Sequence, residues 1–199
     1  HNLSNRLSKG RSPTIENTEI IYNAGHGRCM VRRTFKPPKG AAYTHHLWWH
    51  LRPPSSIVFP LTTDRNVVAI REFRHGMADF SLEFPGGSSD IAQMELPEET
   101  AKRELLEETG YKANGIIKLV CDPWIETQSM NLRYHPFLAF DCTFVAQPTR
   151  DETEIMETLL IPIEKWYEMV FAGQIVSNCA IAHSLLALPY LLKEKIKFI

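Results

Sequence analysis

The sequence predicts an α+β protein in which strands pair mainly with their chain neighbours and helices come late. Strand-like runs rich in β-branched and aromatic residues, bounded by turn residues, fill most of positions 18–84. One helix candidate stands in the middle of the chain, and two more lie near its end. Because strand and helix do not alternate regularly, this order does not suit a parallel sheet built from βαβ units.

An N-terminal region of three candidate strands precedes the main domain. The turn-like stretches AGHG and KPPKG separate these strands. The stretch 51–56, rich in Pro and Ser, marks the boundary that we predict between a strand region at 1–54 and a main domain at 55–199. The three strand-like runs are TEIIYN at 18–23, RCMVRRTF at 28–35 and YTHHLWWHL at 43–51.

The main domain contains the remaining strands and all three predicted helices. The central helix is expected to begin at Pro97, which suits a first helical position, and to end before Gly110, which suits the residue just past a helix. Ahead of it, Pro85 and the two glycines that follow predict a tight turn. The other strands are expected at 56–63, 66–74, 80–84, 115–121, 133–145 and 156–163, and the other helices at 164–173 and 178–195.

The composition is that of an ordinary globular protein. The formal net charge is −1, with 44% hydrophobic and 23% charged residues, so total charge does not favour nucleic acid or an anionic membrane. The longest apolar run is too short to span a bilayer, so no membrane partner is expected. The four cysteines, Cys29, Cys121, Cys142 and Cys179, are scattered without a C-x-x-C pair, which favours a reducing, cytoplasmic compartment. A nucleic-acid partner is disfavoured.

The central helix concentrates acidic residues on one face. At about 100° per residue, Glu104, Glu107 and Glu108 fall within an arc of about 100°. Like charges at this spacing cost about 0.2–0.5 kcal/mol per pair, and Arg103, four residues before Glu107, can offset one of them. A divalent cation such as Mg²⁺ or Mn²⁺, which prefers carboxylate oxygens, would compensate for the rest. The alternative is a solvated helix face, which is what many Glu-rich stretches form.

The order of the residues favours the cation site. The string RELLEETGY at 103–111 resembles the second half of the Nudix box, whose pattern is G-x5-E-x7-R-E-U-x-E-E-x-G-U, where U is aliphatic or aromatic. Glu95 also stands at the distance before Arg103 that this pattern requires. All acidic and basic positions of the pattern therefore match, which makes the resemblance highly specific.

The front of the box departs from the pattern. Ser89 occupies the place of the first glycine, whereas Gly87 stands two residues earlier and Gly86 three, before SSDIAQM. We read this difference as a two-residue insertion. A longer loop is therefore expected ahead of an undisturbed helix.

The resemblance implies roles for the residues of the box. In the family, this loop–helix–loop holds divalent cations and supports hydrolysis of a nucleoside diphosphate linked to another group. Carried over to this chain, the resemblance implies that the metal ligands are Glu104, Glu107 and Glu108, with Gly87 at the metal site. The catalytic residues of the box would be Glu104, Glu108 and Arg103, which orients a glutamate. The structural positions would be Gly86, Glu95 and Gly110.

Beyond the box, the chain is similar to ADP-ribose and nucleotide-sugar pyrophosphatases. This likeness implies that Arg74 contacts the diphosphate or ribose and that Glu83 lies at the edge of the metal site. It places Glu152 and Glu154 in an acidic loop that supplies a general base, with Glu152 slightly favoured. Trp48 would stack on the base or fill a subunit interface. Solvated or surface roles remain the alternatives for Arg74 and the acidic loop.

The activity implied is Mg²⁺-dependent cleavage of the pyrophosphate in ADP-ribose or a related nucleoside diphosphate sugar, giving a nucleoside monophosphate and a sugar phosphate. Mn²⁺ is an alternative ion, and a cytoplasmic homodimer is expected. The loop at 122–131 departs from the family pattern, which leaves the sugar half of the substrate open. The alternatives are a dinucleoside polyphosphate hydrolase, an RNA-cap hydrolase and a non-catalytic module that binds nucleotide sugars.

Overall fold

The structure is a computed structural model that describes residues 12–119, 122–123, 125–150 and 154–193. The chain divides into two compact units. The first comprises His1–Pro53 together with Glu126–Leu132, and the second comprises Pro54–Ile125 together with Arg133–Ile199. None of the described helices combines the length and the apolar character that crossing a bilayer requires.

The first unit is a three-stranded antiparallel sheet in the order β1-β2-β3. The tight connection between its first two strands passes through Gly25, His26 and Gly27, all of which have positive φ. The edge strand β3 also contacts the short segment 126–132, because the Trp48 N–H donates to the Ser129 carbonyl at 2.8 Å. The strands are β1 (Thr14–Gly25), β2 (Arg28–Lys36) and β3 (Tyr43–His50).

The second unit is built on a mixed sheet in the order β11-β5-β4-β10-β8, with β6 on β5, β7 on β4 and β9 on β10. The pair β10 and β4 is parallel, and the other pairs are antiparallel. The strands are β4 (Ser55–Thr62), β5 (Asn66–Arg74), β6 (Asp79–Glu83), β7 (Gly86–Gly87), β8 (Tyr111–Lys112), β9 (Gly115–Lys118), β10 (Tyr134–Phe144) and β11 (Met156–Pro162).

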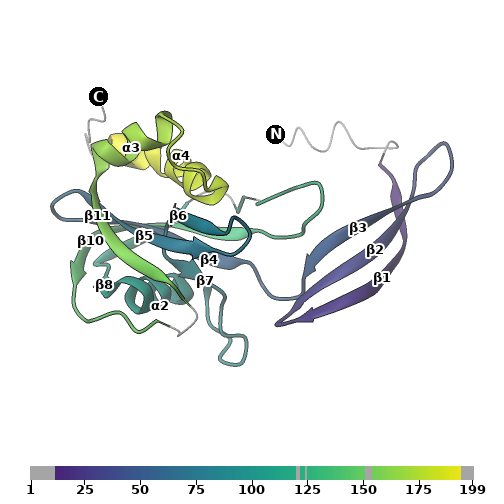
Figure 1. Ribbon diagram of the computed structural model, residues 1–199, viewed down its shortest axis with the longest axis horizontal. Coiled ribbons are helices and arrows are strands. Elements are labelled where there is room, and N and C mark those ends of the chain that lie inside the picture. Colours follow the sequence, from purple (N-terminus) through teal and green to yellow (C-terminus); the bar gives the residue numbers. More distant parts are fainter. Residues whose placement is uncertain (1–11, 120–121, 124, 151–153, 194–199) are drawn as a thin grey trace. The chain divides into compact units, whose positions relative to one another are not determined.

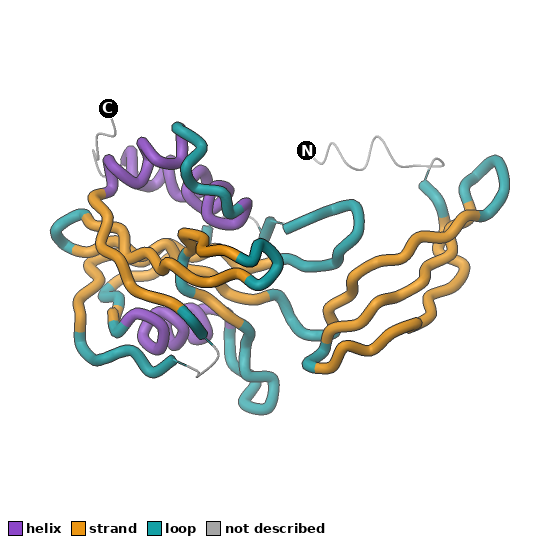
Figure 2. Tube along the Cα trace, viewed as in Figure 1, coloured by secondary structure: helices purple, strands orange, loops and turns teal. Residues whose placement is uncertain are grey.

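Helices cover both faces of this sheet. Helix α2 (Pro97–Thr109) lies on one face, and helices α3 (Ile163–Phe171) and α4 (Asn178–Lys193) lie on the other (Figure 1). Figure 2 shows the same three layers as helix, strand and helix. The order of elements is the α+β arrangement predicted from the sequence.

The central strands form a core on both faces of the sheet because successive side chains of a strand point in opposite directions. Phe59 of β4 and Leu138 of β10 pack in the cluster that includes α3 and α4. Their chain neighbours Val58 and Phe137 pack in the cluster that includes Leu105 of α2. Burial of these apolar side chains therefore fixes α2 on its own face of the sheet.

Two short strands differ from the predictions. Gly86 and Gly87, expected to form a turn, make the two-residue strand β7, which pairs antiparallel with Ser56 and Ile57 of β4. Tyr111 and Lys112 make the similarly short β8, which pairs with the end of β10 and had no predicted counterpart. Such short strands are determined by their partners, because two residues carry no periodicity that a sequence pattern could reveal.

Candidate active site

The glutamate helix α2 begins and ends at the predicted residues. Pro97 is its first residue, and the Leu96 N–H is satisfied by the Glu99 carboxylate at 2.9 Å. At the other end, Gly110 has φ 77° and donates its N–H to the Leu106 carbonyl at 2.8 Å. Leu105 is fully buried against the sheet, so the neighbouring glutamates lie along the rim of this contact.

The two glycines of β7 bring the strand backbone against the glutamate side chains. A Cβ atom on Gly87 would lie 2.3 Å from Glu104 Oε1, and one on Gly86 would lie 2.3 Å from the Ser56 carbonyl oxygen. Gly86 also donates its N–H to the Glu108 carboxylate at 2.9 Å. Absence of a side chain at Gly87 therefore leaves the space that Glu104 occupies, and absence of one at Gly86 allows β7 to lie close to β4.

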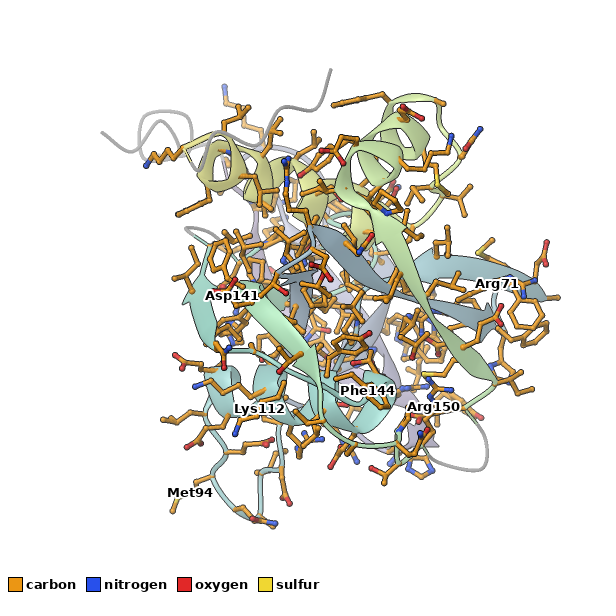
Figure 3. The ribbon with its side chains drawn as sticks, turned by 90° about the vertical axis from the view of Figure 1, so that its left-hand side faces the viewer. Arg71, Met94, Lys112, Asp141, Phe144 and Arg150 are labelled. Carbon is orange, nitrogen blue, oxygen red and sulfur yellow. The ribbon has the colours of Figure 1, made fainter. Side chains whose placement is uncertain are left out.

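The loop between β7 and α2 contains the stretch SSDIAQM, which we interpret as an insertion. Its turn is built by Asp90, whose carboxylate accepts the Ala92 N–H at 2.9 Å. Ser89, which stands where the family pattern has a glycine, does not adopt a positive φ, whereas the exposed Met94 does, at 52°. Figure 3 shows Met94 at the tip of this loop. The residues SSDIAQM lie in this loop, and α2 begins at Pro97 as predicted.

Arg103 connects this loop to the glutamate face. Its guanidinium donates to Glu95 at 2.8 and 3.0 Å, to the Ser88 carbonyl at 3.1 Å, to Glu104 at 2.9 Å and to Glu107 at 2.8 Å. These charge-assisted bonds to Arg103 hold the pKa of the Glu95 carboxyl low, at about 2. Arg103 thus contacts Glu104 and Glu107 on the helix, and Glu95 anchors it to the loop.

Four carboxylates influence one another around α2. Glu108 is only 6% exposed, and burial, followed by the charge of Glu104, raises its pKa to about 9, although its hydrogen bond from Gly86 opposes this. Burial likewise raises the pKa of Glu104 and of Glu72 on β5, and Glu154 adds to the rise at all three groups. Burial and mutual repulsion therefore disfavour the ionised form of these carboxylates.

The chemistry of this cluster fits a hard divalent cation, because every donor is a carboxylate oxygen and a cation would favour the ionised form that burial disfavours. Arg103 engages Glu104 and Glu107 in the structure. Among the described residues, no three His, Cys, Asp or Glu side chains stand ready as a complete ligand set. Binding an ion would thus require the glutamates to turn away from Arg103, with water or substrate oxygens completing the shell.

Comparison with known families agrees with the box on α2. The family model described as a NUDIX domain matches residues 51–172, which is more than half of the chain. The chain belongs to the Nudix family. The likeness extends to whole proteins, because an ADP-ribose pyrophosphatase of Bacillus subtilis is 27% identical over 165 residues, covering 80% of this chain and 83% of that protein.

Two further comparisons bear on this Nudix chain. A CMP-5'-(N-acetyl-N-hydroxy-3-aminopropyl)phosphonate hydrolase of Streptomyces rubellomurinus is 29% identical over 143 residues, or 71% of this chain and 66% of that protein. The crystal structure of an ADP compounds hydrolase matches with a TM-score of 0.80 at 19% identity, covering 94% of this chain and 98% of that one. The structural match shows a shared fold.

A second group of side chains lies on β5 and β6, beside the candidate site. Arg74 lies between two carboxylates, with Nη1 2.9 Å from Glu72 and Nε 3.4 Å from Glu83. The Ser177 hydroxyl, next to the start of α4, donates to Glu83 at 2.6 Å. The predicted residues Arg74 and Glu83 are therefore brought together, and Glu72 links them electrostatically to Glu108.

The other predicted residues lie in different parts of the chain. Glu154 lies close enough to the Nudix glutamates to raise their pKa values, whereas Glu152 falls outside the described residues. Trp48 lies on β3 of the first unit and is 40% exposed. Its neighbour Trp49 is half-buried beneath the Arg33 guanidinium, which lies 4.2 Å from the ring centroid.

The sequence patterns missed two residues near the Nudix site. Glu72 precedes Arg74 by two positions on β5, so strand alternation could have placed both side chains on one face. Arg150 donates to the Glu108 carbonyl across 42 residues of chain. That contact has no local signal in the sequence, because it depends on how β10 returns to the end of α2.

Proposed function

We propose that this chain is a divalent-cation-dependent Nudix pyrophosphohydrolase that cleaves ADP-ribose or a related nucleoside diphosphate sugar. The products would be a nucleoside monophosphate and a sugar phosphate. The observation that carries the proposal is that Glu108 is buried beside Glu104 on the helix of the Nudix box. Arg103 donates a hydrogen bond to Glu104 there. Similarity to the ADP-ribose pyrophosphatase of Bacillus subtilis over most of both chains supports ADP-ribose as the first substrate.

Glu104, Glu107 and Glu108 would hold the ion, Mg²⁺ first and Mn²⁺ as the alternative, with Gly87 leaving room for the Glu104 carboxylate. A bound divalent ion neutralises charge on the diphosphate and lowers the pKa of a water that it holds. Arg103 would neutralise the glutamates before the ion enters and then orient them through its remaining bond to Glu95.

A carboxylate of the acidic segment would accept the proton of the attacking water. Glu154 is the better-supported base because its charge helps to raise the pKa of Glu72, Glu104 and Glu108. Glu152 remains the second candidate. As the water oxygen bonds to one phosphorus, the bridging P–O bond breaks and the other phosphate leaves with its electron pair.

Arg74 and Glu83 would contact the substrate beside the ion. Arg74 forms ion pairs with Glu72 and Glu83 and is partly exposed. Its guanidinium suits a phosphate or ribose oxygen. Trp48 would stack on the base of a substrate or pack in a subunit interface. The similarity to a hydrolase of a cytidine nucleotide leaves the preferred base open.

We propose that the protein is a homodimer. Residues 1–53 and 126–132, which form the first unit, contain nine Lys or Arg and three Asp or Glu, whereas the rest of the chain contains 13 and 20. This asymmetry makes the first unit of one copy attractive to the second unit of another. Exposed Ile15, Ile20 and Tyr22 on β1 supply apolar surface for such a contact. A reducing, cytoplasmic location is also proposed, from the free Cys29, Cys142 and Cys179.

A substrate panel tests the proposed activity. Purified protein would be assayed with Mg²⁺ or Mn²⁺ against ADP-ribose, other sugar nucleotides, dinucleoside polyphosphates and capped RNA, with phosphate released by added phosphatase as the readout. The highest kcat/KM is expected for ADP-ribose or another nucleoside diphosphate sugar. Preference for a dinucleoside polyphosphate or for capped RNA would replace this substrate, and binding without turnover would identify a non-catalytic module.

A further inference from the structure

The C-terminal end of α2 is capped by a segment that arrives from β10. The last carbonyls of a helix have no partners within the helix and carry partial negative charge. No basic residue lies in the last turn of α2. Instead, the Glu107 carbonyl accepts the Thr149 N–H at 2.8 Å, and the Glu108 carbonyl accepts Arg150 Nε–H at 2.8 Å. Arg150 therefore brings the positive charge that the helix end lacks.

The Arg150 guanidinium also binds β11. Its Nη1 donates to the Met156 carbonyl at 2.8 Å, and its Nη2 donates to the Thr158 hydroxyl at 2.7 Å. The three nitrogens of the planar guanidinium thus bind the end of α2 and the start of β11. Figure 3 shows Arg150 beside this end of α2.

These contacts join the backbone segments that carry three of the clustered carboxylates. Glu108 is itself bonded through its carbonyl, and Glu154 lies two residues before Met156. Met156 is the register partner of Glu72 in the β11–β5 ladder. A shift of the helix end relative to β11 would therefore change the spacing of all three carboxylates.

We propose that Arg150 is a positioning residue for the hydrolysis, which fixes the distance between Glu108 and the carboxylates of Glu72 and Glu154. This inference rests on the proposed function of the site. Arg150 touches no clustered carboxylate in the hydrogen bonds described above, so it acts through the backbone and not through charge pairing. A lysine keeps the charge but offers one ammonium in place of the planar fork, and it cannot reach three acceptors with the same geometry.

The test compares Arg150→Gln and Arg150→Lys with the control variant Arg71→Gln. Arg71 lies on β5, where its 46% exposed side chain forms an ion pair with Glu157 of β11 at 2.9 Å, outside the carboxylate cluster. Both arginines are labelled in Figure 3. The measurements are kcat and KM for the best substrate of the panel, the Mg²⁺ concentration for half-maximal rate, Mn²⁺ binding by electron paramagnetic resonance without substrate, and Tm.

Arg150→Gln is expected to lower kcat about 10- to 100-fold, to change the substrate KM less than about threefold, and to weaken Mn²⁺ binding. Arg150→Lys should fall between this variant and the wild type, and Arg71→Gln should match the wild type. Wild-type kcat and Mn²⁺ affinity in Arg150→Gln would overturn the inference, as would an equal loss in Arg71→Gln. If Arg150→Gln does not fold, the same two measurements on Arg150→Lys decide.

A failure of the proposed function would look different. If the wild-type protein turned over no substrate of the panel, the proposed hydrolase function would be contradicted, independently of the result for Arg150. An active wild-type protein with an unaffected Arg150→Gln variant would remove only the positioning role.

Discussion

Glu108 is held at two points, because its carboxylate accepts the Gly86 N–H and its carbonyl accepts Arg150 Nε–H. Glu108→Gln keeps a side-chain acceptor of similar size but removes the charge that the proposed ion requires. We expect kcat to fall at least about 100-fold while far-UV circular dichroism and Tm stay close to those of the wild type. Turnover near the wild-type rate would remove Glu108 from the cation site.

The adjacent glycines of β7 differ in what a methyl group would meet. In Gly87→Ala, the new Cβ would approach Glu104 Oε1, the end of a flexible side chain. In Gly86→Ala, it would approach the Ser56 carbonyl oxygen and, at 2.8 Å, Ile57 Cα, which are backbone atoms. We expect Gly87→Ala to lose mainly activity and Gly86→Ala to lose about 1–3 kcal/mol of unfolding free energy.

Urea denaturation and kcat measured on both glycine variants check this division. Gly87→Ala should unfold at nearly the wild-type urea concentration, so that its lost activity reflects a displaced Glu104. The reverse pattern, with Gly86→Ala stable and Gly87→Ala unfolded, would contradict the close packing of β7 against β4 and α2.

His183 predicts a pH dependence of stability. It is fully buried in α4, its Nε2 lies 2.8 Å from the Phe137 carbonyl, and burial lowers its pKa from 6.5 to about 4. Between these pH values the unfolded chain binds a proton that the folded protein does not, so the free energy of unfolding falls as pH falls. The loss attributable to His183 should be about 2 kcal/mol at pH 5 relative to pH 7.5.

Comparison with His183→Gln isolates this contribution, because glutamine can still donate to the Phe137 carbonyl but does not titrate. Urea denaturation at pH 7.5 and pH 5 should show a larger loss of stability in the wild type than in the variant. Equal losses would mean that the carboxylates alone govern the acid response.

At the scale of elements, long segments were predictable and short ones were not. Helix α2 was expected from Pro97 and Gly110, and it occupies Pro97–Thr109 in the structure. Strands β7 and β8 escaped prediction, because each contains two residues and exists through pairing with β4 or β10. Local patterns describe an element well only when it is long enough to show its own period.

The candidate site divides in the same way. Glu104, Glu107 and Glu108 could be grouped from sequence because positions three and four apart share a helix face. Their connection to Glu72 and Arg150 could not, because it joins segments that only the folded sheet brings together. Residue spacing therefore grouped the three glutamates of α2, whereas only the folded structure shows that Glu72 and Arg150 lie near them.

At the scale of the whole molecule, a net charge of −1 conceals two oppositely charged regions. If attraction between the basic first unit and the acidic second unit stabilises the proposed homodimer, salt should weaken it. The Debye length falls from about 10 Å at 0.1 M to about 3 Å at 1 M ionic strength. We expect the dimer dissociation constant to rise at least about tenfold between 0.05 and 1 M NaCl.

Sedimentation velocity across a concentration series at each salt concentration checks this expectation. Matched measurements in sucrose of equal osmolality control for effects of crowding and viscosity. A dimer dissociation constant that does not change with NaCl concentration would indicate an interface formed by apolar side chains such as those exposed on β1. A monomer at low salt would contradict the homodimer.

The loop before α2 is fastened at both of its ends, since Arg103 binds the Ser88 carbonyl at one end and the Glu95 carboxylate at the other. Between these anchors the tip is free of the glutamates, and Met94 there is 85% exposed. A change in the length of this tip would therefore leave the glutamate helix in place. The same tip offers a place to insert a spectroscopic label or peptide tag that would report on the site from outside it.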